Sequence, residues 1–239
     1  MLVVDAQRSS STHGLSFRKG KNGPEQDLLN WFLDQKVISV PRGHNVTVFR
    51  EPRLPSGFPD LVFVVWKDSI ARHWTVERAR LTATDLRIMH FLGNEGPTSV
   101  EALRSIFSAS VEDRLELLAE AQMVRAKGTS WRARSLDSTF AASHIIAVEA
   151  KINEWKGALD QAHLNTWFAS ESCILIPRIP KNSELLQAAT KRGVRVLAKE
   201  DSASIRLTST ARSGPKSYVS WLFNDWAWRA SNSIGAFSK

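Results

Sequence analysis

Pro59-Asp60-Leu61-Val62-Phe63-Val64-Val65 is one of two stretches that decide the fold, and the other is Ile145-Ile146-Ala147-Val148-Glu149-Ala150-Lys151. Each contains a short apolar run of the kind typical of a buried strand. Asp60 stands before the first run, and Glu149 stands at the end of the second, 89 residues later. The two stretches therefore predict two buried strands with carboxylates at their ends.

The segments around these strands favour an alternation of helices and strands. Pro24 suits a first helical turn, and the apolar residues after it recur at helical spacing, so a helix over about 24–37 is predicted. Further strands are expected near 46–49, 61–66, 144–150, 173–176 and 194–198, with helices near 153–169 and 182–191. This order predicts an α/β protein with a central mixed sheet flanked by helices.

Residues 80–135 differ in character and predict a separate module. Three short helical patterns precede a hairpin that has Gly128 in its turn, which is the pattern of a winged helix-turn-helix. The module is inserted between the two carboxylate-bearing stretches. We expect a flexible basic arm over 1–22, a discontinuous core over 23–79 and 136–239, and the winged helix over 80–135.

Composition narrows the partners and the compartment. The 239-residue chain has a net charge of +8, which favours nucleic acid as a partner and, second to it, an anionic membrane surface. A lone cysteine, Cys173, excludes an internal disulfide and a cysteine-rich zinc site. No apolar stretch approaches the roughly 20 residues that span a bilayer, and no signal-peptide pattern is visible. We expect a cytoplasmic protein that does not act at a membrane.

Asp60 and Glu149 are residue types that can hold a divalent metal beside a phosphodiester. Carboxylate oxygens are usual ligands of Mg²⁺, and the bound ion can activate a water, neutralise charge and stabilise a leaving oxygen. We expect Asp60, Glu149 and the Ala150 carbonyl to be metal ligands, with Mn²⁺ able to replace Mg²⁺. The alternative is that Asp60 caps a turn after Pro59.

Lys151 and Glu25 extend the predicted site. Residues two apart in a strand share a face, so Lys151 should lie beside Glu149. Its ammonium group could orient the attacking water or stabilise developing charge. Glu25, on the predicted first helix, could add a ligand. Alternatively, Glu149 and Lys151 form a solvated pair at the edge of the sheet.

The order of helix, Pro-Asp hairpin, Glu-x-Lys strand and helix resembles the PD-(D/E)xK, restriction-endonuclease-like nuclease superfamily. The motif stands here as Pro59-Asp60 and Glu149-Ala150-Lys151, within a resemblance that covers about 24–66 and 144–200. The resemblance implies a restriction-endonuclease-like core and Mg²⁺-dependent cleavage of DNA, with Asp60, Glu149 and Lys151 catalytic. The inserted module accounts for a spacing that is long for the superfamily.

The helix after the motif also resembles that of prokaryotic members, in which a glutamine often projects toward the active site. Gln161 is the matching residue, and the resemblance implies that it belongs to the catalytic group. Several relatives carry Gln-x-x-x-Tyr, whereas here Asn165 stands at the tyrosine position. Gln161 and Asn165 share a helix face, and they could hydrogen-bond a phosphate or water. The alternative is a wetted polar face.

Basic side chains near the catalytic hairpin and in the wing are expected to contact DNA phosphates. These candidates are Arg42, Arg50, Arg53, Arg125, Lys127, Arg132 and Arg134. The helix expected to enter the major groove is mostly acidic, with Glu112, Asp113, Glu116 and Glu120 against Arg114. Its outer face should repel DNA, so the module could instead contact a protein partner. Two nicks on a duplex favour a homodimer.

The sequence therefore predicts a metal-dependent DNA endonuclease that hydrolyses phosphodiester bonds. The resemblance points to a prokaryotic role in restriction, defence or mobile elements. The alternative function is a non-catalytic DNA-binding or regulatory protein that uses the winged helix and keeps a nuclease-like scaffold. No residue excludes RNA as the substrate.

Overall fold

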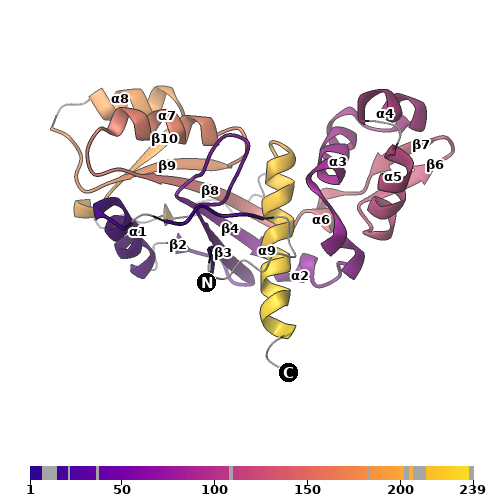
Figure 1. The fold of residues 1–239 in the computed structure, drawn as a ribbon, viewed down its shortest axis with the longest axis horizontal. Helices are drawn as coiled ribbons and strands as arrows, with labels where there is room; N and C mark the ends of the chain where they lie inside the picture. Colours follow the sequence, from indigo (N-terminus) through magenta and orange to yellow (C-terminus); the bar gives the residue numbers. More distant parts are fainter. Residues whose placement is uncertain are drawn as a thin grey trace. The chain divides into compact units, whose positions relative to one another are not determined.

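The computed structural model (Figure 1) describes residues 1–6, 15–20, 22–35, 38–107, 110–181, 184–201, 205–206 and 214–236. Contacts within the chain divide it into two compact units. The first unit comprises Met1–Val65 and Ser143–Ser213, and the second comprises Trp66–Ala142 and Gly214–Lys239. Each unit is thus built from two separate segments of the chain.

The first unit is built on a six-stranded mixed sheet flanked by helices, so the predicted α/β class is confirmed. In sheet order the strands are β1 (Leu2–Val4), β3 (His44–Arg50), β4 (Leu61–Lys67), β8 (Ala142–Ala150), β9 (Glu171–Ile176) and β10 (Val194–Ala198). The helices are α1 (Pro24–Asp34), α7 (Trp155–Asn165), α8 (Glu184–Lys191) and the short η3 (Lys199–Asp201). A separate parallel pair joins β2 (Ile38–Ser39) and β11 (Ile205–Arg206).

Alternating side chains on β9 bury both faces of the sheet. Cys173 and Leu175 belong to the core that includes the buried side chains of α1, and Ile174 and Ile176 belong to the core under α7 and α8. Successive residues of a strand point to opposite faces, so α1 covers one face and α7 and α8 cover the other. Cys173 is fully buried and pairs in parallel register with Val148 of β8.

Strand β1 lies inside the segment 1–22, for which the sequence predicts a flexible arm. Its residues pair in parallel with Thr47–Phe49 of β3. Leu2, Val3 and Val4 are apolar, and two of them are β-branched, which explains why they join the sheet. The rest of the predicted arm includes residues 7–14 and 21, which lie outside the described residues.

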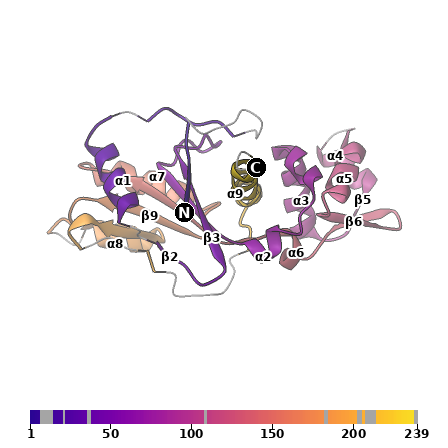
Figure 2. The ribbon, with the colours of Figure 1, turned by 90° about the horizontal axis from the view of Figure 1, so that it is seen from below.

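The second unit combines helices with a small antiparallel sheet whose order is β5-β7-β6. Its elements are α2 (Asp68–Ala71), η2 (Val76–Arg80), α3 (Ala83–Glu95), β5 (Thr98–Ser99), α4 (Val100–Phe107), α5 (Val111–Glu120), β6 (Val124–Lys127), β7 (Ser130–Ala133), α6 (Leu136–Thr139) and α9 (Tyr218–Ala236). A capping box of Thr82 and Asp85 starts α3. Figure 2 shows α9 end-on beside α3, against which it packs. No helix in the described ranges is long and apolar enough to cross a bilayer.

A buried ion pair joins η2 to α9 inside the second unit. Arg78 donates to Asp225 Oδ1 from Nε at 3.2 Å and from Nη2 at 2.8 Å, and both side chains are at most 1% exposed. Arg78 Nη2 also donates to the Thr139 carbonyl at 2.6 Å, and Asn224 Nδ2 donates to Asp225 Oδ1 at 2.9 Å. The guanidinium carbon lies 3.4 Å from the ring centroid of Trp74. This network links three segments of the unit at its centre.

Candidate active site

The two central strands of the sheet bring the two carboxylate-bearing stretches together. Strands β4 and β8 are neighbours, Asp60 immediately precedes β4, and Glu149 is the penultimate residue of β8. The Ala150 N–H donates to Asp60 Oδ2 at 2.8 Å. Residues separated by 89 positions in the sequence therefore meet at one end of the central strands.

Glu149 is buried beside Asp60. Its side chain belongs to a residue only 4% exposed, and its Oε1 accepts a hydrogen bond from Asn165 Nδ2 at 2.7 Å. Burial and, second to it, the neighbouring charge of Asp60 raise the pKa of Glu149 to about 8, whereas the hydrogen bonds from Asn165 and from the Asp60 backbone oppose this rise. Because β8 lies between β4 and β9, the solvated edge pair considered above does not describe Glu149.

Asp60 titrates under a similar influence. Burial raises the pKa of Asp60 to about 6, against the lowering effect of the Ala150 N–H. The charges of Glu51 and Glu25 also contribute to this raised pKa, and the charge of Arg18 opposes them. Burial thus hinders the ionisation of both Asp60 and Glu149, and the charge of Asp60 adds to this effect at Glu149, an arrangement that a bound cation would relieve.

Lys151 forms an ion pair with Glu25 at the N-terminal end of α1. Its Nζ lies 2.7 Å from Glu25 Oε1, and Glu25 stands in the first turn of the helix. Lys151 was predicted to lie beside Glu149, and in the structure its ion pair is with Glu25. The charge of Glu25 also raises the pKa of Asp60, by less than burial does.

Arg18 and Glu51 complete the cluster, and the sequence analysis missed both. Arg18 Nε donates to a Glu51 carboxylate oxygen, and Arg18 Nη2 lies 4.0 Å from Asp60 Oδ1. Glu51 is 5% exposed and has a φ of 50°, a left-handed conformation that is unusual for a residue with a side chain. In sequence, Glu51 lies in a proline-rich link and Arg18 in the predicted arm, so neither position signalled a buried contact.

The helix after the motif contributes Asn165 and not Gln161. Asn165 is buried and donates to Glu149, whereas Gln161 is exposed one turn earlier on α7. Within the described residues, no hydrogen bond joins Gln161 to the carboxylate cluster. Of the two residues predicted to share a helix face, Asn165 is therefore the one that contacts the cluster.

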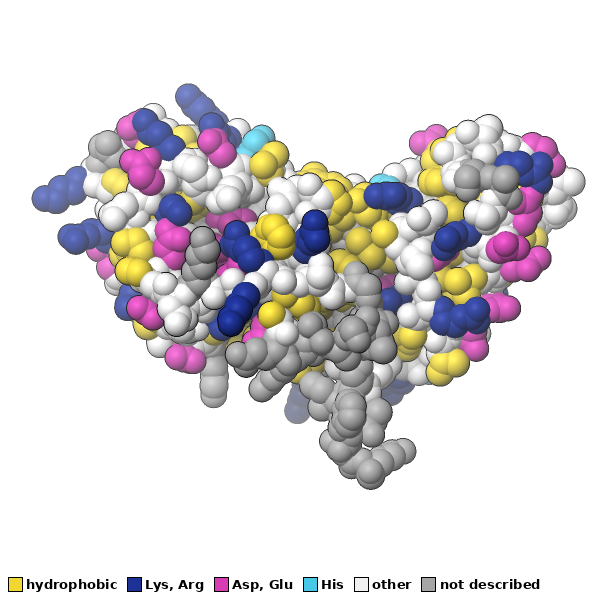
Figure 3. Space-filling view, viewed as in Figure 1, with side chains coloured by type: hydrophobic (Ala, Val, Ile, Leu, Met, Phe, Trp, Pro, Cys, Tyr) yellow, Lys and Arg dark blue, Asp and Glu magenta, His cyan; other side chains and the backbone are white. Residues whose placement is uncertain are grey.

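The three arginines near the β3–β4 hairpin do not form one patch. Arg50 ends β3 close to the cluster and donates to Asn30 Oδ1, and Arg53 is exposed in the following link. Arg42 precedes the other end of the seven-residue β3. At about 3.3 Å per residue, Arg42 and Arg50 are roughly 20 Å or more apart. Figure 3 likewise shows basic and acidic side chains interspersed on the face it presents.

The four basic residues predicted for the wing share one face of the β6–β7 hairpin. Arg125 pairs directly with Arg132 across the two strands, and Lys127 and Arg134 lie two positions from these. Residues two apart in a strand point the same way. Like charges opposite one another are unfavourable unless an anion neutralises them, so this face suits a phosphate backbone.

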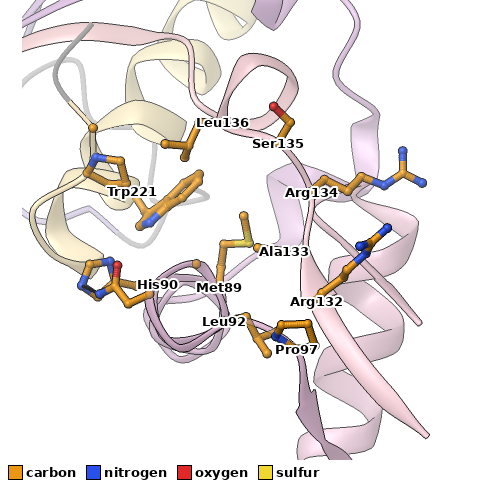
Figure 4. A pocket seen from close by; sticks show the side chains of 15 residues that line it. Met89, His90, Leu92, Pro97, Arg132, Ala133, Arg134, Ser135, Leu136 and Trp221 are labelled. Atoms are coloured by element: carbon orange, nitrogen blue, oxygen red, sulfur yellow. Dashed lines mark hydrogen bonds between the residues drawn. The ribbon is translucent and has the colours of Figure 1, made fainter. Parts of the chain in front are cut away.

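A cavity of about 450 Å³ lies in the second unit, and its described lining residues include no acid. Figure 4 shows Met89, Leu92, Leu136 and Trp221 around it, with His90 at one side. Arg132 and Arg134 come from the β7 side, and their guanidinium groups point away from Trp221. The lining is largely apolar, and its described residues offer no carboxylate that could hold a divalent cation.

The donor set of the cluster fits a hard divalent cation. In the described ranges, no three His, Cys, Asp or Glu side chains form a ready-made metal-binding group. Mg²⁺ is nevertheless often held by one or two carboxylates, with water and substrate oxygens completing its shell. Asp60 and Glu149 supply two carboxylates, and among the described residues Asp60 Oδ1 meets only the distant Arg18. The main chain of Ala150 lies against the same pair.

No protein-family model, curated protein or solved structure matches this chain. The functional argument therefore rests on the residues and their geometry. The cluster offers a buried carboxylate next to a partly buried one, a lysine held by a third carboxylate, and an arginine beside a fourth. Such a set can bind a cation, orient a water and neutralise an anionic substrate.

Glu149→Gln is expected to stabilise the protein at alkaline pH in the absence of divalent metal. The pKa of Glu149 is raised from 4.5 to about 8 in the folded chain, so the folded state holds a proton that the unfolded state releases. Stability therefore falls as pH rises from about 4.5 to 8, and the amide removes this loss. Thermal unfolding in EDTA at several pH values should show a Tm gain of several degrees above pH 8, since about 1 kcal/mol moves Tm by roughly 2–4 °C.

Glu154→Gln is the matched control, because Glu154 is an exposed acid five residues away. Its Tm should follow that of the wild-type chain at every pH. A Glu149→Gln protein whose Tm also follows the wild type across the whole range would show that Glu149 ionises normally.

Proposed function

We propose that the protein is a metal-dependent DNA endonuclease, with a restriction-endonuclease-like core in the first unit and a winged helix-turn-helix in the second. The observation that carries the proposal is the meeting of Asp60 and Glu149 at the ends of adjacent central strands. A residue that only caps a turn would stay hydrated, whereas both carboxylates here have raised pKa values because of burial. Evident strain at Glu51 beside them also favours a functional site.

Each residue of the cluster has a role that its contacts support. Asp60 and Glu149 would hold Mg²⁺, with Mn²⁺ able to substitute, and the bound cation would neutralise phosphate charge and acidify a water. The Ala150 N–H fixes the Asp60 carboxylate, and Asn165 fixes that of Glu149. Lys151, oriented by Glu25, would donate to an oxygen of the phosphate and stabilise its developing charge.

The second unit supports binding of DNA through its wing. Its order of helix, strand, two helices and two strands corresponds to a winged helix. The shared face of the wing cations would contact phosphates. Two acids of α5 pair with neighbours, Glu112 with Arg104 and Glu120 with Arg80. Arg114, the basic residue of α5, pairs with Asp85 of α3, so the helix gives no support to base reading in the major groove. From the resemblance, we propose a prokaryotic restriction, defence or mobile-element role.

Nicking of supercoiled plasmid tests the proposal. We expect cleavage with Mg²⁺ or Mn²⁺ and none with EDTA. The rate should rise between about pH 6 and 8, because the pKa values of Asp60 and Glu149 lie near these limits and only the ionised carboxylates bind a cation well. Metal titrations at each pH should show weaker apparent metal affinity at the acidic end. Cleavage that persists in EDTA, or that slows as pH rises through this range, would contradict the proposal.

A labelled RNA of the same sequence, assayed in parallel, decides the substrate class. Preference for the RNA would keep the chemistry and replace the substrate. Binding of DNA without cleavage of either polymer under any of these conditions would favour the regulatory alternative.

A further inference from the structure

A second cavity, of about 510 Å³, lies within the first unit beside the carboxylate cluster. Its polar lining combines three cationic side chains with three amides, namely Arg18, Lys19, Arg50, Asn22, Gln26 and Asn30. Among the described lining residues, Asp5 is the one acid. This composition favours an anion, because the cationic groups and amides can all donate hydrogen bonds.

Two of the cations have donors that the described residues leave unused. Arg50 is half-buried, and its Nη2 donates to Asn30 Oδ1. Its Nε is buried and has no acceptor among the described residues. A buried donor without an acceptor is costly, so the contacts of Arg50 with the described residues leave its guanidinium incompletely satisfied. Lys19 is exposed and forms no ion pair within the described ranges.

The amides and the start of α1 extend this donor surface. Gln26 Nε2 donates to Asn30 Oδ1 at 3.3 Å, so the same oxygen accepts from Gln26 and from Arg50 and positions both side chains. Helix α1 begins directly after Gly23, and a glycine has no side chain that could cap the first N–H groups of the helix. The first N–H groups of a helix carry partial positive charge, which adds to the field of the cations.

Arg18 connects this cavity to the candidate active site. The same side chain lines the cavity, pairs with Glu51 and lies 4.0 Å from Asp60 Oδ1. Gly20 forms part of the shared wall, and a Cβ there would lie 3.1 Å from Glu51 Oε1 and 3.2 Å from Gln26 Oε1. The cavity and the carboxylate cluster are therefore adjacent, and Arg18 and Gly20 border both.

We propose that this cavity holds a second phosphate of the substrate strand, next to the one that is cleaved. Arg50 and Lys19 supply the charge, the amides of α1 supply further donors, and Arg18 separates the two phosphate positions. The inference rests on the proposed nuclease function for the identity of the strand, and on the cavity alone for its affinity for phosphate. It makes the strand's backbone, and not its bases, the feature that the first unit recognises.

Binding of inorganic phosphate to the full chain in EDTA tests the cavity without any cleavage. Phosphorus NMR or calorimetry should detect binding to the wild-type chain, and Arg50→Ala should weaken it at least tenfold. Lys19→Glu should weaken it as well, and because Lys19 is exposed this variant cannot fail through loss of packing. Lys191→Glu is the matched control, since it makes the same charge change on α8, on the other face of the sheet. Equal phosphate binding by all four proteins would overturn the proposal.

Binding of a DNA oligonucleotide in EDTA tests whether the phosphate belongs to a strand. Arg50→Ala should reduce the slope of log affinity against log salt by about one, the value for one lost phosphate contact. An unchanged slope would overturn the strand assignment, and binding of free phosphate alone would then describe the cavity. Plasmid cleavage is scored separately. Binding of phosphate and of the strand without any cleavage would contradict the nuclease proposal and support the phosphate site. Cleavage with an unaltered salt slope would support the nuclease proposal and contradict the assignment of the cavity to a phosphate of the strand.

Discussion

Asp60→Asn is expected to lower metal-dependent plasmid cleavage by at least about a thousandfold while the chain stays folded. The amide oxygen can still accept from the Ala150 N–H, so the local geometry is kept. The substitution removes the anionic charge that would hold the cation. A thousandfold loss corresponds to about 4 kcal/mol of transition-state stabilisation, which is within the range that a catalytic metal supplies. Initial rates at saturating Mg²⁺, together with circular dichroism, measure both quantities.

Asp113→Asn is the control for this variant, because Asp113 is an exposed acid on α5 in the second unit. It should cleave at the wild-type rate. Asp60→Asn should also raise Tm in metal-free alkaline buffer, since the pKa of Asp60 is raised by burial and the folded chain gains from its neutralisation. Full cleavage by a folded Asp60→Asn protein would remove Asp60 from the mechanism.

Asp225→Ala is expected to destabilise the second unit by about 3–5 kcal/mol, which is typical when one partner of a buried ion pair is removed. Arg78 would keep its bond to the Thr139 carbonyl but lose its counter-charge while fully buried. Burial already lowers the pKa of Arg78, and Asp225 is what opposes this effect. Urea unfolding followed by hydrogen exchange of α3 and α9 would report the change.

The double variant Arg78→Met/Asp225→Leu distinguishes a lost charge partner from lost packing. Replacement of both charges by apolar groups of similar size is often neutral or stabilising. The double variant should therefore be more stable than Asp225→Ala. Equal losses in both proteins would show that packing around Trp74, and not the uncompensated charge, dominates this site.

Sequence patterns predicted the strands better than the last helix. The strand at 194–198 is confirmed residue for residue, because a short β-branched run bounded by a glycine turn has few alternatives. Helix α9 was not predicted, because Trp221 to Trp228 are buried nearly all round. A segment buried on every side has no polar stripe, so no helical period is visible. In contrast, Thr82-x-x-Asp85 is a readable capping signal that the sequence analysis overlooked.

The carboxylates of the candidate site could be predicted, but their neighbours could not. Asp60 and Glu149 stand at the ends of apolar runs, and the end of an apolar run in the sequence marks the end of a strand in the structure. The choice of Asn165 over Gln161 depends on how α7 is rotated against β8, which packing decides. Arg18 reaches Glu51 from 33 residues away through a contact that no local pattern encodes.

The single cysteine gives this protein a built-in reporter of sheet opening. Cys173 is fully buried on β9, and its partner in the register, Val148, immediately precedes Glu149. Burial raises the pKa of the Cys173 thiol well above its ordinary value, so the closed sheet protects it from alkylation. The rate of alkylation then measures how often β8 and β9 separate next to the carboxylates. The rate of local opening beside the site can therefore be measured in the unaltered chain, without any engineered label.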